Sequence, residues 1–250
     1  MGSQSHNFKE NDREGHDTMN VIFNADKFND WMYKSIKPFL KGDILEIGSG
    51  IGNITQFLTD DKIKVTASDI RDNYCSILQN RFDENPYLKE IINIDIIHPD
   101  FDNKYQGLFD KFDSIFALNI VEHVENDLLS IQNCRKLLRT RGNLIILVPA
   151  YPVLYNRFDK ELGHYRRYTK SKLEKLLITT DFEILKTQYF NFIGIFGWWF
   201  SGSLLLKKTI PEGQMKIFNR LVPIFKLIDK IVMNKVGLSV ITFGTKNQVH

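Results

Sequence analysis

The stretch LEIGSGIGNIT, residues 45–55, places three glycines directly after a short apolar run. Gly48, Gly50 and Gly52 would weaken a strand or a helix, so they indicate a loop in which the backbone turns tightly. An acidic residue, Glu46, lies within the apolar run that precedes them. The pattern predicts a strand, a glycine loop and a helix in succession, which is the context in which such loops bind ligands.

Short apolar runs alternate with helical patterns along the rest of the chain. Strands are predicted at 43–48, 64–70, 90–96, 111–120, 143–149, 182–190 and 237–244. Helices are predicted at 24–40, 52–60, 72–83, 126–140, 170–179 and 214–234. Continuous apolar strands that alternate with helices indicate a mostly parallel sheet covered on both faces. The predicted fold class is therefore α/β, with a doubly wound, Rossmann-like sheet of seven strands.

The composition agrees with one globular domain, because 43% of the 250 residues are hydrophobic and 25% are charged. Residues 1–20 are predicted to form a flexible N-terminal tail, and residues 21–250 a single domain. The core of that domain is predicted at 40–150. Two further segments, 151–181 and 191–236, are predicted to form substrate or cap elements.

Charge and cysteine content exclude some function classes. The net charge of +3 is too small for a dedicated nucleic-acid-binding protein, so no nucleic-acid partner is expected. Cys75 and Cys134 are far apart, and no CxxC or Cys/His cluster is present, so no metal is expected. Two cysteines without a signal peptide indicate a reducing, cytoplasmic setting. The sequence contains no run of 18 uncharged apolar residues, so no membrane-spanning helix is expected.

A second acid, Asp69, ends the second predicted strand about twenty residues after the loop. Its carboxylate can accept hydrogen bonds from both hydroxyls of a ribose, which predicts a cofactor that contains a nucleoside. A dinucleotide-binding loop normally has the pattern GxGxxG, but Asn53 occupies the place of its third glycine here. A carboxylate at Glu46 suits a cationic amino or sulfonium group and disfavours a pyrophosphate.

LEIGSGIG, Asp69, Asp95 and the segment NIVEHVEND at 119–127 together resemble the class I S-adenosylmethionine-dependent methyltransferases. The resemblance implies a sheet whose last strand is antiparallel. It also implies that the cofactor is S-adenosylmethionine, with S-adenosylhomocysteine as its product. The residues that it assigns to the cofactor are Glu46, Gly48, Ser49, Gly50 and Gly52 for the methionine part, Asp69 for the ribose, Ile70, Asp95 and Ile96 for the adenine, and Asn119 and Ile120 for the methionine side.

Methyl transfer to a hydroxyl or a protonated amine requires a base, and two segments supply candidates. His123, in NIVEHVE, is predicted either to be a base or to shape its loop and contact the cofactor. Glu122 and Glu125 are expected at the start of the following helix. The segment DKELGHYRRY, 159–168, follows the fifth strand and is predicted to fold over the cofactor pocket.

In that covering segment, His164 and Tyr165 are the remaining candidate catalytic residues. The candidate acceptor-binding residues are Tyr151, Arg166, Tyr168, Asn191 and Trp198. The alternative is a structural clamp, in which an arginine pairs with Asp159 or Glu161 and the tyrosines pack beneath. The phrase GHYRRYT also resembles a subgroup of bacterial methyltransferases whose substrates are mostly unassigned.

The apolar segment FIGIFGWWFSGSLLL, 192–206, has two alternative interpretations. It is either an inserted helix packed on the sheet and on residues 214–234, or a wall of an acceptor pocket that can also touch a membrane. Tryptophans beside Lys207 and Lys208 favour an interfacial position.

The predicted function is S-adenosylmethionine-dependent methyl transfer to an oxygen or nitrogen of a small-molecule or lipid-like acceptor. The alternatives are a protein or peptide methyltransferase and a non-catalytic S-adenosylmethionine-binding module. The predicted location is cytoplasmic, with peripheral contact to a membrane as the variant. The sequence assigns no oligomeric state.

Overall fold

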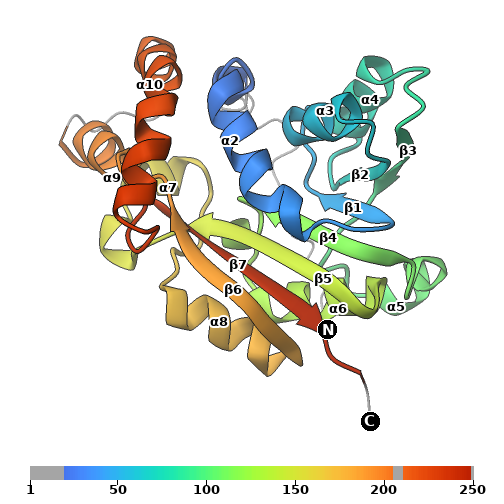
Figure 1. Ribbon diagram of the computed structural model, residues 1–250. Coiled ribbons are helices and arrows are strands. Elements are labelled where there is room, and N and C mark those ends of the chain that lie inside the picture. Colours follow the sequence, from blue (N-terminus) through green and yellow to red (C-terminus); the bar gives the residue numbers. More distant parts are fainter. Residues whose placement is uncertain (1–19, 205–210, 249–250) are drawn as a thin grey trace.

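The computed structural model describes residues 20–204 and 211–248. The predicted tail at 1–20 falls almost entirely outside the described residues, as do Leu205, Leu206, Lys207 and Lys208. The described chain forms one sheet with helices on both faces (Figure 1).

Seven strands form the sheet, and their order is β3-β2-β1-β4-β5-β7-β6. The strands are β1 (Ile44–Ile47), β2 (Val65–Asp69), β3 (Leu88–Asn93), β4 (Phe112–Leu118), β5 (Leu138–Pro149), β6 (Phe182–Phe190) and β7 (Ser239–Lys246). β7 runs antiparallel to both of its neighbours, β5 and β6, and the other pairs are parallel. The predicted seven-stranded, mostly parallel sheet with an antiparallel last strand is confirmed.

The helices alternate with the strands along the chain. The α-helices are α2 (Asp26–Ile36), α3 (Asn53–Asp60), α4 (Asp72–Arg81), α5 (Phe101–Lys104), α6 (Asp127–Leu137), α7 (Arg157–Glu161), α8 (Lys170–Thr179), α9 (Gly194–Trp198) and α10 (Glu212–Ile231). The short 3₁₀ turns are η1 (Lys37–Phe39), η2 (Gln106–Leu108), η3 (Val121–His123) and η4 (Pro152–Leu154), and η5 (Trp199–Leu204) is a π-helical turn.

Some predicted boundaries differ from the observed ones. The third strand ends at Asn93, so Asp95 lies in the loop after β3 and not within a strand. The helix predicted at 126–140 ends at Leu137, because the chain enters β5 at the next residue. The helix predicted at 24–40 ends at Ile36, where Pro38 lies in the tighter turn η1.

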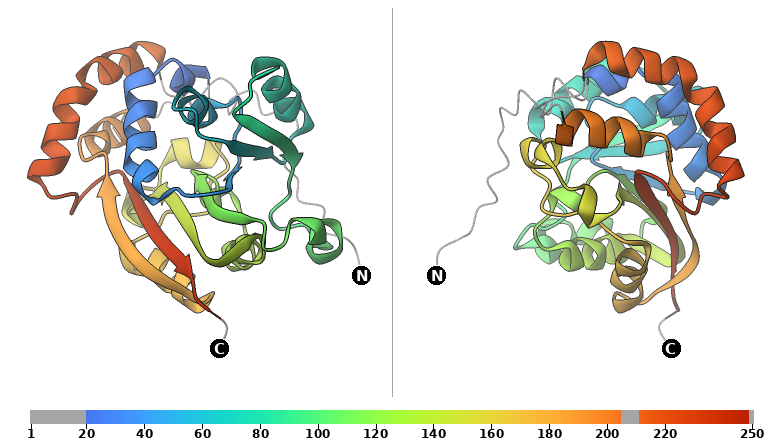
Figure 2. Two further views of the ribbon diagram at one scale, coloured as in Figure 1. Left: turned by 45° about the vertical axis from the view of Figure 1, so that its right-hand side comes forward. Right: turned by 90° about the vertical axis from the view of Figure 1, so that its left-hand side faces the viewer.

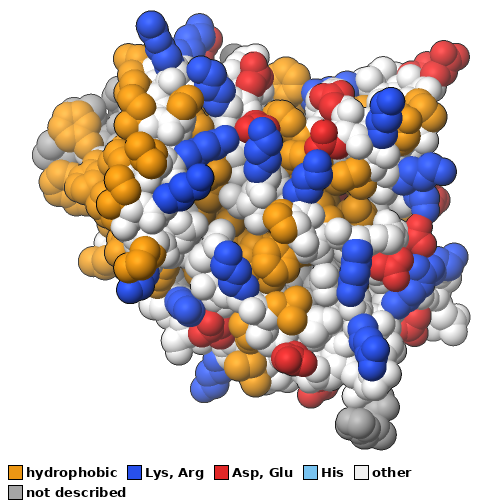
Figure 3. All heavy atoms as spheres, in the orientation of Figure 1, with side chains coloured by type: hydrophobic (Ala, Val, Ile, Leu, Met, Phe, Trp, Pro, Cys, Tyr) orange, Lys and Arg blue, Asp and Glu red, His pale blue; other side chains and the backbone are white. Residues whose placement is uncertain are grey.

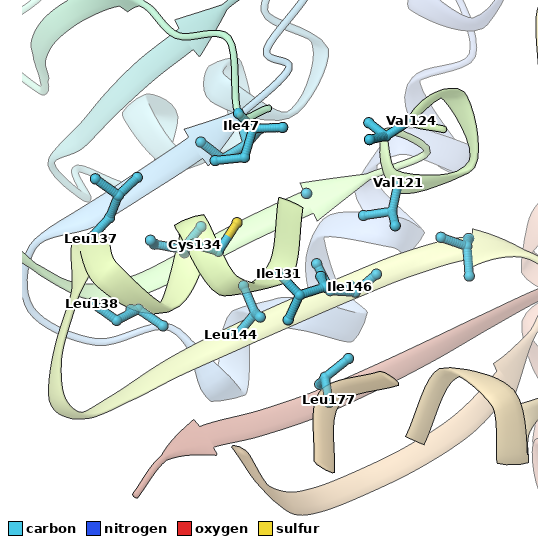
Figure 4. Close-up of a cluster of buried hydrophobic side chains, with 14 of the residues drawn as sticks. Ile47, Val121, Val124, Ile131, Cys134, Leu137, Leu138, Leu144, Ile146 and Leu177 are labelled. Atoms are coloured by element: carbon cyan, nitrogen blue, oxygen red, sulfur yellow. The ribbon is translucent and has the colours of Figure 1, made fainter. Parts of the chain in front are cut away.

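The apolar side chains alternate between two cores, one on each face of the sheet. On one face, Leu144 and Ile146 of β5 pack with α6 and α8, as the close-up in Figure 4 shows. On the other face, Ile145 and Leu147 of the same strand pack beneath α2 and α10. Residues 144–149 of β5 are buried on both faces, and this part of the strand is continuously apolar, as expected for a central strand.

α10 and α2 are far apart in sequence but lie side by side (Figures 1 and 2). The backbone N–H of Phe28 donates to the side-chain oxygen of Asn219 at 3.1 Å, and Lys226 pairs with Asp30 at 3.1 Å. Within the described part of the segment at 191–236, predicted as a cap, α10 therefore packs on α2, and both helices contribute to the wall of the cavity described below.

Candidate functional site

A cavity of about 410 Å³ lies at the carboxyl ends of β1, β2 and β4. Its outer walls come from α2, from the segment after β5, from α9 and η5, and from the start of α10. The sheet order reverses between β1 and β4, which is the point where doubly wound sheets bind ligands. The volume lies within the range of small-molecule sites, about 300–1,000 Å³.

The glycine loop forms the floor of this cavity. Gly48 has a φ of +74° and Gly52 a φ of +86°, which is the left-handed region that favours glycine. A Cβ atom at Gly48 would lie 2.1 Å from Cδ1 of Ile120. The N–H of Ser49 donates to the carbonyl of Ser68 at 2.8 Å and ties the loop to β2. The local sequence therefore needs glycine both for its backbone angles and for the close approach of the loop after β4.

Asp69 connects the end of β2 to the glycine loop. Its carboxylate is buried and accepts from the backbone N–H of Gly50 at 2.9 Å and of Arg71 at 3.0 Å. Burial raises the pKa of Asp69, and the hydrogen bonds from Arg71 and Gly50 act against that rise. Each carboxylate oxygen has a second lone pair, so the side chain can still accept two ribose hydroxyls from the cavity.

Glu46 is the second buried carboxyl group of the floor. Oε2 accepts from the hydroxyl of Thr55 at 2.5 Å, and burial raises the pKa of Glu46 to about 7. Hydrogen bonds from Thr55 and Ser49 act against that rise, while the charge of Asp69 adds to it. A cationic ligand in the cavity would favour the ionised form of Glu46. An amino or sulfonium group, which the sequence predicts near Glu46, is such a cation.

The other predicted cofactor residues meet at the same cavity. Its lining includes every one of them except Gly52: Glu46, Gly48, Ser49, Gly50, Asp69, Ile70, Asp95, Ile96, Asn119 and Ile120. Asp95 turns the loop after β3, where its Oδ1 accepts from the N–H of Ile97 at 3.0 Å. Asn119 has a φ of +56° and ends β4, so the chain turns sharply there toward η3.

The covering segment contains a fully buried ion pair. Asp159 accepts a hydrogen bond from Nε of Arg167 at 2.8 Å. It is also hydrogen-bonded to Nδ1 of His164 at 2.8 Å. Burial raises the pKa of Asp159, but His164 and Arg167 together hold it below its usual range. Arg167 also donates to the carbonyl of Ala150 at 3.0 Å. Arg167 therefore forms the pair with Asp159 that the clamp alternative predicts, and both Arg167 and His164 line the cavity.

Glu122 and His123 lie on η3, and they line the cavity next to His164. The rings of His123 and His164 meet edge to face, with 4.6 Å between their centroids. One ligating atom from each of the three residues lies within 4.8 Å of the other two. Burial, with the charges of His164 and Arg71, lowers the pKa of His123 to about 3, so its ring is neutral.

Glu122 is a site residue that sequence reasoning missed. The sequence predicted it at the start of a helix, in the helix dipole, but the structure buries it completely in the cavity wall. Burial raises its pKa to about 8, and the charge of Arg167 only partly opposes this. Its sequence environment, NIVEHVE, carries no signal for burial, because the 3₁₀ turn of η3 breaks the helical period.

Four of the predicted catalytic and acceptor-binding residues lie outside the cavity lining. Tyr151 stacks on Tyr189 with 5.1 Å between ring centroids, and Tyr165 is half-exposed. Arg166 pairs with Asp127 at 2.9 Å, and the hydroxyl of the buried Tyr168 donates to the same carboxylate at 2.9 Å. These contacts are structural, and the catalytic or acceptor-binding roles predicted for Tyr151, Tyr165, Arg166 and Tyr168 remain predictions.

Asn191 and Trp198, the other predicted acceptor-binding residues, do line the cavity. The buried Asn191 has a φ of +65°, and its side-chain oxygen accepts from the N–H of Gly194 at 2.9 Å, which starts α9. Trp198 packs on Phe158 and beneath the guanidinium of Arg167, 4.6 Å from the ring centroid. The described part of the apolar segment has features of both interpretations: it is helical and its Ser201 donates to Gln214 of α10 at 2.7 Å, and Gly194, Gly197, Trp198 and Ser201 line the cavity.

Comparisons with known proteins agree with this geometry. The fold is that of the class I methyltransferases. Residues 45–144 match the family model described as a methyltransferase domain. No curated protein matches the chain.

Three solved structures illustrate the similarity. An S-adenosylmethionine-dependent methyltransferase from Archaeoglobus fulgidus is 17% identical, with 87% of this chain and 94% of that chain covered and a TM-score of 0.55. Phosphoethanolamine N-methyltransferase 2 of Haemonchus contortus, in complex with S-adenosylmethionine, is 14% identical. The match covers 87% of this chain and 52% of that chain, with a TM-score of 0.58. This chain thus spans about half the length of that enzyme.

The third is the (4+2)-cyclase SpnF, which is 13% identical, with 90% of this chain and 81% of that chain covered and a TM-score of 0.59. A protein described as a cyclase therefore shares the fold with proteins described as methyltransferases. The fold alone does not determine which reaction the cavity supports, so function must be argued from the side chains.

Proposed function

We propose that the protein binds S-adenosylmethionine in this cavity and transfers its methyl group to an oxygen or nitrogen of a small-molecule or lipid-like acceptor. The observation that carries the proposal is the pair of buried carboxyl groups, Glu46 and Asp69, on either side of a glycine loop. Glu46 suits a cationic group, and Asp69 suits a pair of sugar hydroxyls. Both side chains line the same cavity.

Each part of the cofactor has complementary residues. Glu46 and the backbone of the glycine loop would hold the methionine part, and Asp69 would accept from the ribose hydroxyls. Ile70 and Ile96 supply apolar surface for the adenine. Bound S-adenosylmethionine supplies an activated methyl group, so the protein's own contribution is alignment and the handling of a proton.

His164 is the proposed base for an acceptor that must lose a proton. Its Nδ1 is bonded to the buried Asp159, which fixes the tautomer that carries a proton on Nδ1. Nε2 is then free to accept a proton from an acceptor hydroxyl or ammonium group. His123 lies beside His164 with a neutral ring. A charged His123 would repel a proton on His164, but the neutral ring does not.

The acceptor end of the cavity is mainly apolar. Phe158 and Trp198 line it from α7 and α9, and Met215 and Phe218 line it from α10. These walls favour an acceptor with a hydrocarbon or aromatic portion.

Methyl transfer can be tested with methyl-labelled S-adenosylmethionine and separated cell extracts as acceptor sources. We expect label in the small-molecule or lipid fraction, and less label with His164→Asn at unchanged affinity for S-adenosylhomocysteine. Label in the protein fraction would favour a protein methyltransferase. Binding of S-adenosylhomocysteine without any transfer would favour a non-catalytic module, and no binding would refute the proposal.

We also propose that the outer face of α9, η5 and α10 contacts an anionic membrane surface, from which a lipid-like acceptor would enter. Large apolar side chains are exposed along this face: Phe196, Trp199, Phe200, Ile217, Leu221, Ile224, Leu227 and Ile231. On α10 they form one stripe, opposite the buried Met215, Val222 and Phe225. Figure 3 shows hydrophobic side chains gathered over α9 and α10, with basic side chains among those of α10.

Charge favours this partner, because Lys216, Arg220 and Lys230 are exposed on the same helix. Within the described ranges, no helix is long and apolar enough to cross a membrane. We expect the protein to sediment with phosphatidylserine-containing vesicles and Leu227→Glu to weaken that binding. A matched control, Ile178→Glu, changes a similarly exposed residue on α8 and should have no effect. Equal binding of both variants would contradict the assignment.

A further inference from the structure

Two histidines and one carboxylate converge at the acceptor end of the cavity from different parts of the chain. Glu122 and His123 come from η3, directly after β4, and His164 comes from the covering segment 41 residues later. One ligating atom from each lies within 4.8 Å of the other two. Three donors at this separation can surround one ion at bond lengths of about 2.0–2.2 Å after small side-chain rotations.

His164 is oriented as a metal ligand is. Its Nδ1 is bonded to Oδ1 of Asp159 at 2.8 Å, which leaves Nε2 as the ring nitrogen that can ligate. Asp159 is itself fixed by Arg167 at 2.8 Å and by the N–H of Asn156 at 2.9 Å. A carboxylate that holds the far nitrogen of a histidine is the usual support for a metal-bound imidazole, because it fixes the ring and raises its basicity.

Glu122 lacks the partners that a buried carboxyl group normally has. The side chain is 0% exposed, and within the described part of the chain neither carboxylate oxygen accepts a hydrogen bond from another residue; only the backbone N–H of Glu122 itself favours the ionised form. The nearby cation, Arg167, uses its Nε and Nη1 on Asp159 and on the carbonyl of Ala150. Burying a carboxyl group without a partner costs several kcal/mol. A cation between Glu122 and the two imidazoles would remove that cost.

We propose that Glu122, His123 and His164 bind a divalent transition-metal ion. Two imidazole nitrogens and one carboxylate oxygen suit ions such as Zn²⁺, Co²⁺ or Fe²⁺ better than Mg²⁺ or Ca²⁺, which prefer oxygen ligands. Three protein ligands leave positions of the ion open, and the cavity lies on that side. The sequence predicted no metal because these ligands form no short motif.

The ion would also give the cluster a role in methyl transfer, and this part rests on the proposed function. An acceptor hydroxyl that occupied an open position on the ion would have a lower pKa, so its proton would pass to solvent near neutral pH and its oxygen would remain as the nucleophile. In protein that holds the ion, Nε2 of His164 would be occupied as a ligand, so the role of His164 as the base applies only to the metal-free protein. An oxygen acceptor, such as a phenol or another hydroxyl, is the class that this arrangement serves best.

The binding of the ion can be measured without any activity. Protein freed of metal with a chelator is titrated with Co²⁺, whose visible absorption reports nitrogen and oxygen ligation, and with Zn²⁺ in a calorimeter. We expect one ion per chain and at least about a 10-fold loss of affinity with Glu122→Gln. A matched control is Glu125→Gln, three residues away and exposed, which should bind as the parent protein does.

A second variant, His123→Asn, keeps the test valid if Glu122→Gln fails to fold, and His6→Ala/His16→Ala excludes binding by histidines in the N-terminal residues. No binding by the parent protein, or equal binding by the parent, Glu122→Gln and His123→Asn, would overturn the proposal. Affinity for S-adenosylhomocysteine is measured on the same samples. Metal binding without cofactor binding would refute only the proposed function, and the reverse result would refute only the metal site.

Discussion

Replacing Asp69 by asparagine tests the cofactor site most directly. The substitution keeps the size of the side chain but removes the charge that would accept two ribose hydroxyls. A hydrogen bond to a charged group stabilises by about 1–2 kcal/mol more than a neutral one, so the loss is about 2–4 kcal/mol for two such bonds. Calorimetry with S-adenosylhomocysteine should therefore show a dissociation constant about 30-fold to about 800-fold higher.

The fold of this variant should persist. In the free protein Asp69 accepts from the N–H groups of Gly50 and Arg71, and an asparagine oxygen can still accept one of them. Burial disfavours the charged carboxylate, so losing the charge offsets part of the cost. Asp72→Asn is a matched control, because its exposed carboxylate lies three residues away and outside the cavity lining. Unchanged affinity in Asp69→Asn, with both variants folded, would refute the assignment of the ribose.

Three further variants test the loop, the charge and the clamp. Gly48→Ala should lower the melting temperature and weaken cofactor binding, because its Cβ would collide with Ile120 at a backbone angle costing about 1–2 kcal/mol. Affinity for S-adenosylmethionine should rise with pH up to about 7, where Glu46 ionises, and Glu46→Gln should remove that dependence in calorimetry. Arg167→Met should destabilise the fold by about 3–5 kcal/mol in denaturant titrations, because it removes the arginine from a fully buried ion pair and leaves Asp159 with only His164 and the N–H of Asn156.

A second measurement checks the prediction for Glu46, and a control variant checks the prediction for Arg167. The pH dependence of stability has the opposite sign to that of affinity: the pKa of Glu46 is higher in the folded chain, so Glu46 makes unfolding easier as pH rises from about 4.5 to about 7. An affinity for S-adenosylmethionine that falls over this pH range would contradict the charge assigned to Glu46.

Arg157→Met removes an exposed pair with Glu161 and should change stability by no more than about 1 kcal/mol. Equal effects of the two arginine variants would contradict the clamp.

The fold was predictable because its signals are local. Continuous apolar runs such as residues 143–149 are long enough to identify a strand buried on both faces, and glycines at 48, 50 and 52 identify the turn that follows β1. The acid at the end of β2 was predictable for the same reason, since the end of a parallel strand has one position in the sheet. Boundaries were less predictable where tertiary contacts decide them, as at Leu138, where α6 passes directly into β5.

The acceptor end of the cavity was not predictable in the same way. Glu122 and His123 are neighbours in sequence, but their relation to His164 depends on how the segment after β5 folds back over β4. That segment is positioned by Arg167, whose guanidinium reaches Asp159 and the carbonyl of Ala150. No periodicity in the sequence encodes these contacts, because one joins a loop to α7 and the other joins the same loop to the residue after β5.

Asp159 therefore links the stability of the covering segment to the chemistry of the cavity. The same carboxylate oxygen is bonded to Arg167, which fixes the segment, and to His164, which lines the cavity. A substitution at Asp159 would disturb both, so activity measured on that variant alone could not separate structure from catalysis. Arg167→Met and Glu122→Gln together can separate them. The first removes the support and leaves the ligands intact, whereas the second removes a ligand and leaves the buried pair intact. If metal affinity depends on Glu122 in folded protein while unfolding depends on Arg167, the two roles of the covering segment are distinct.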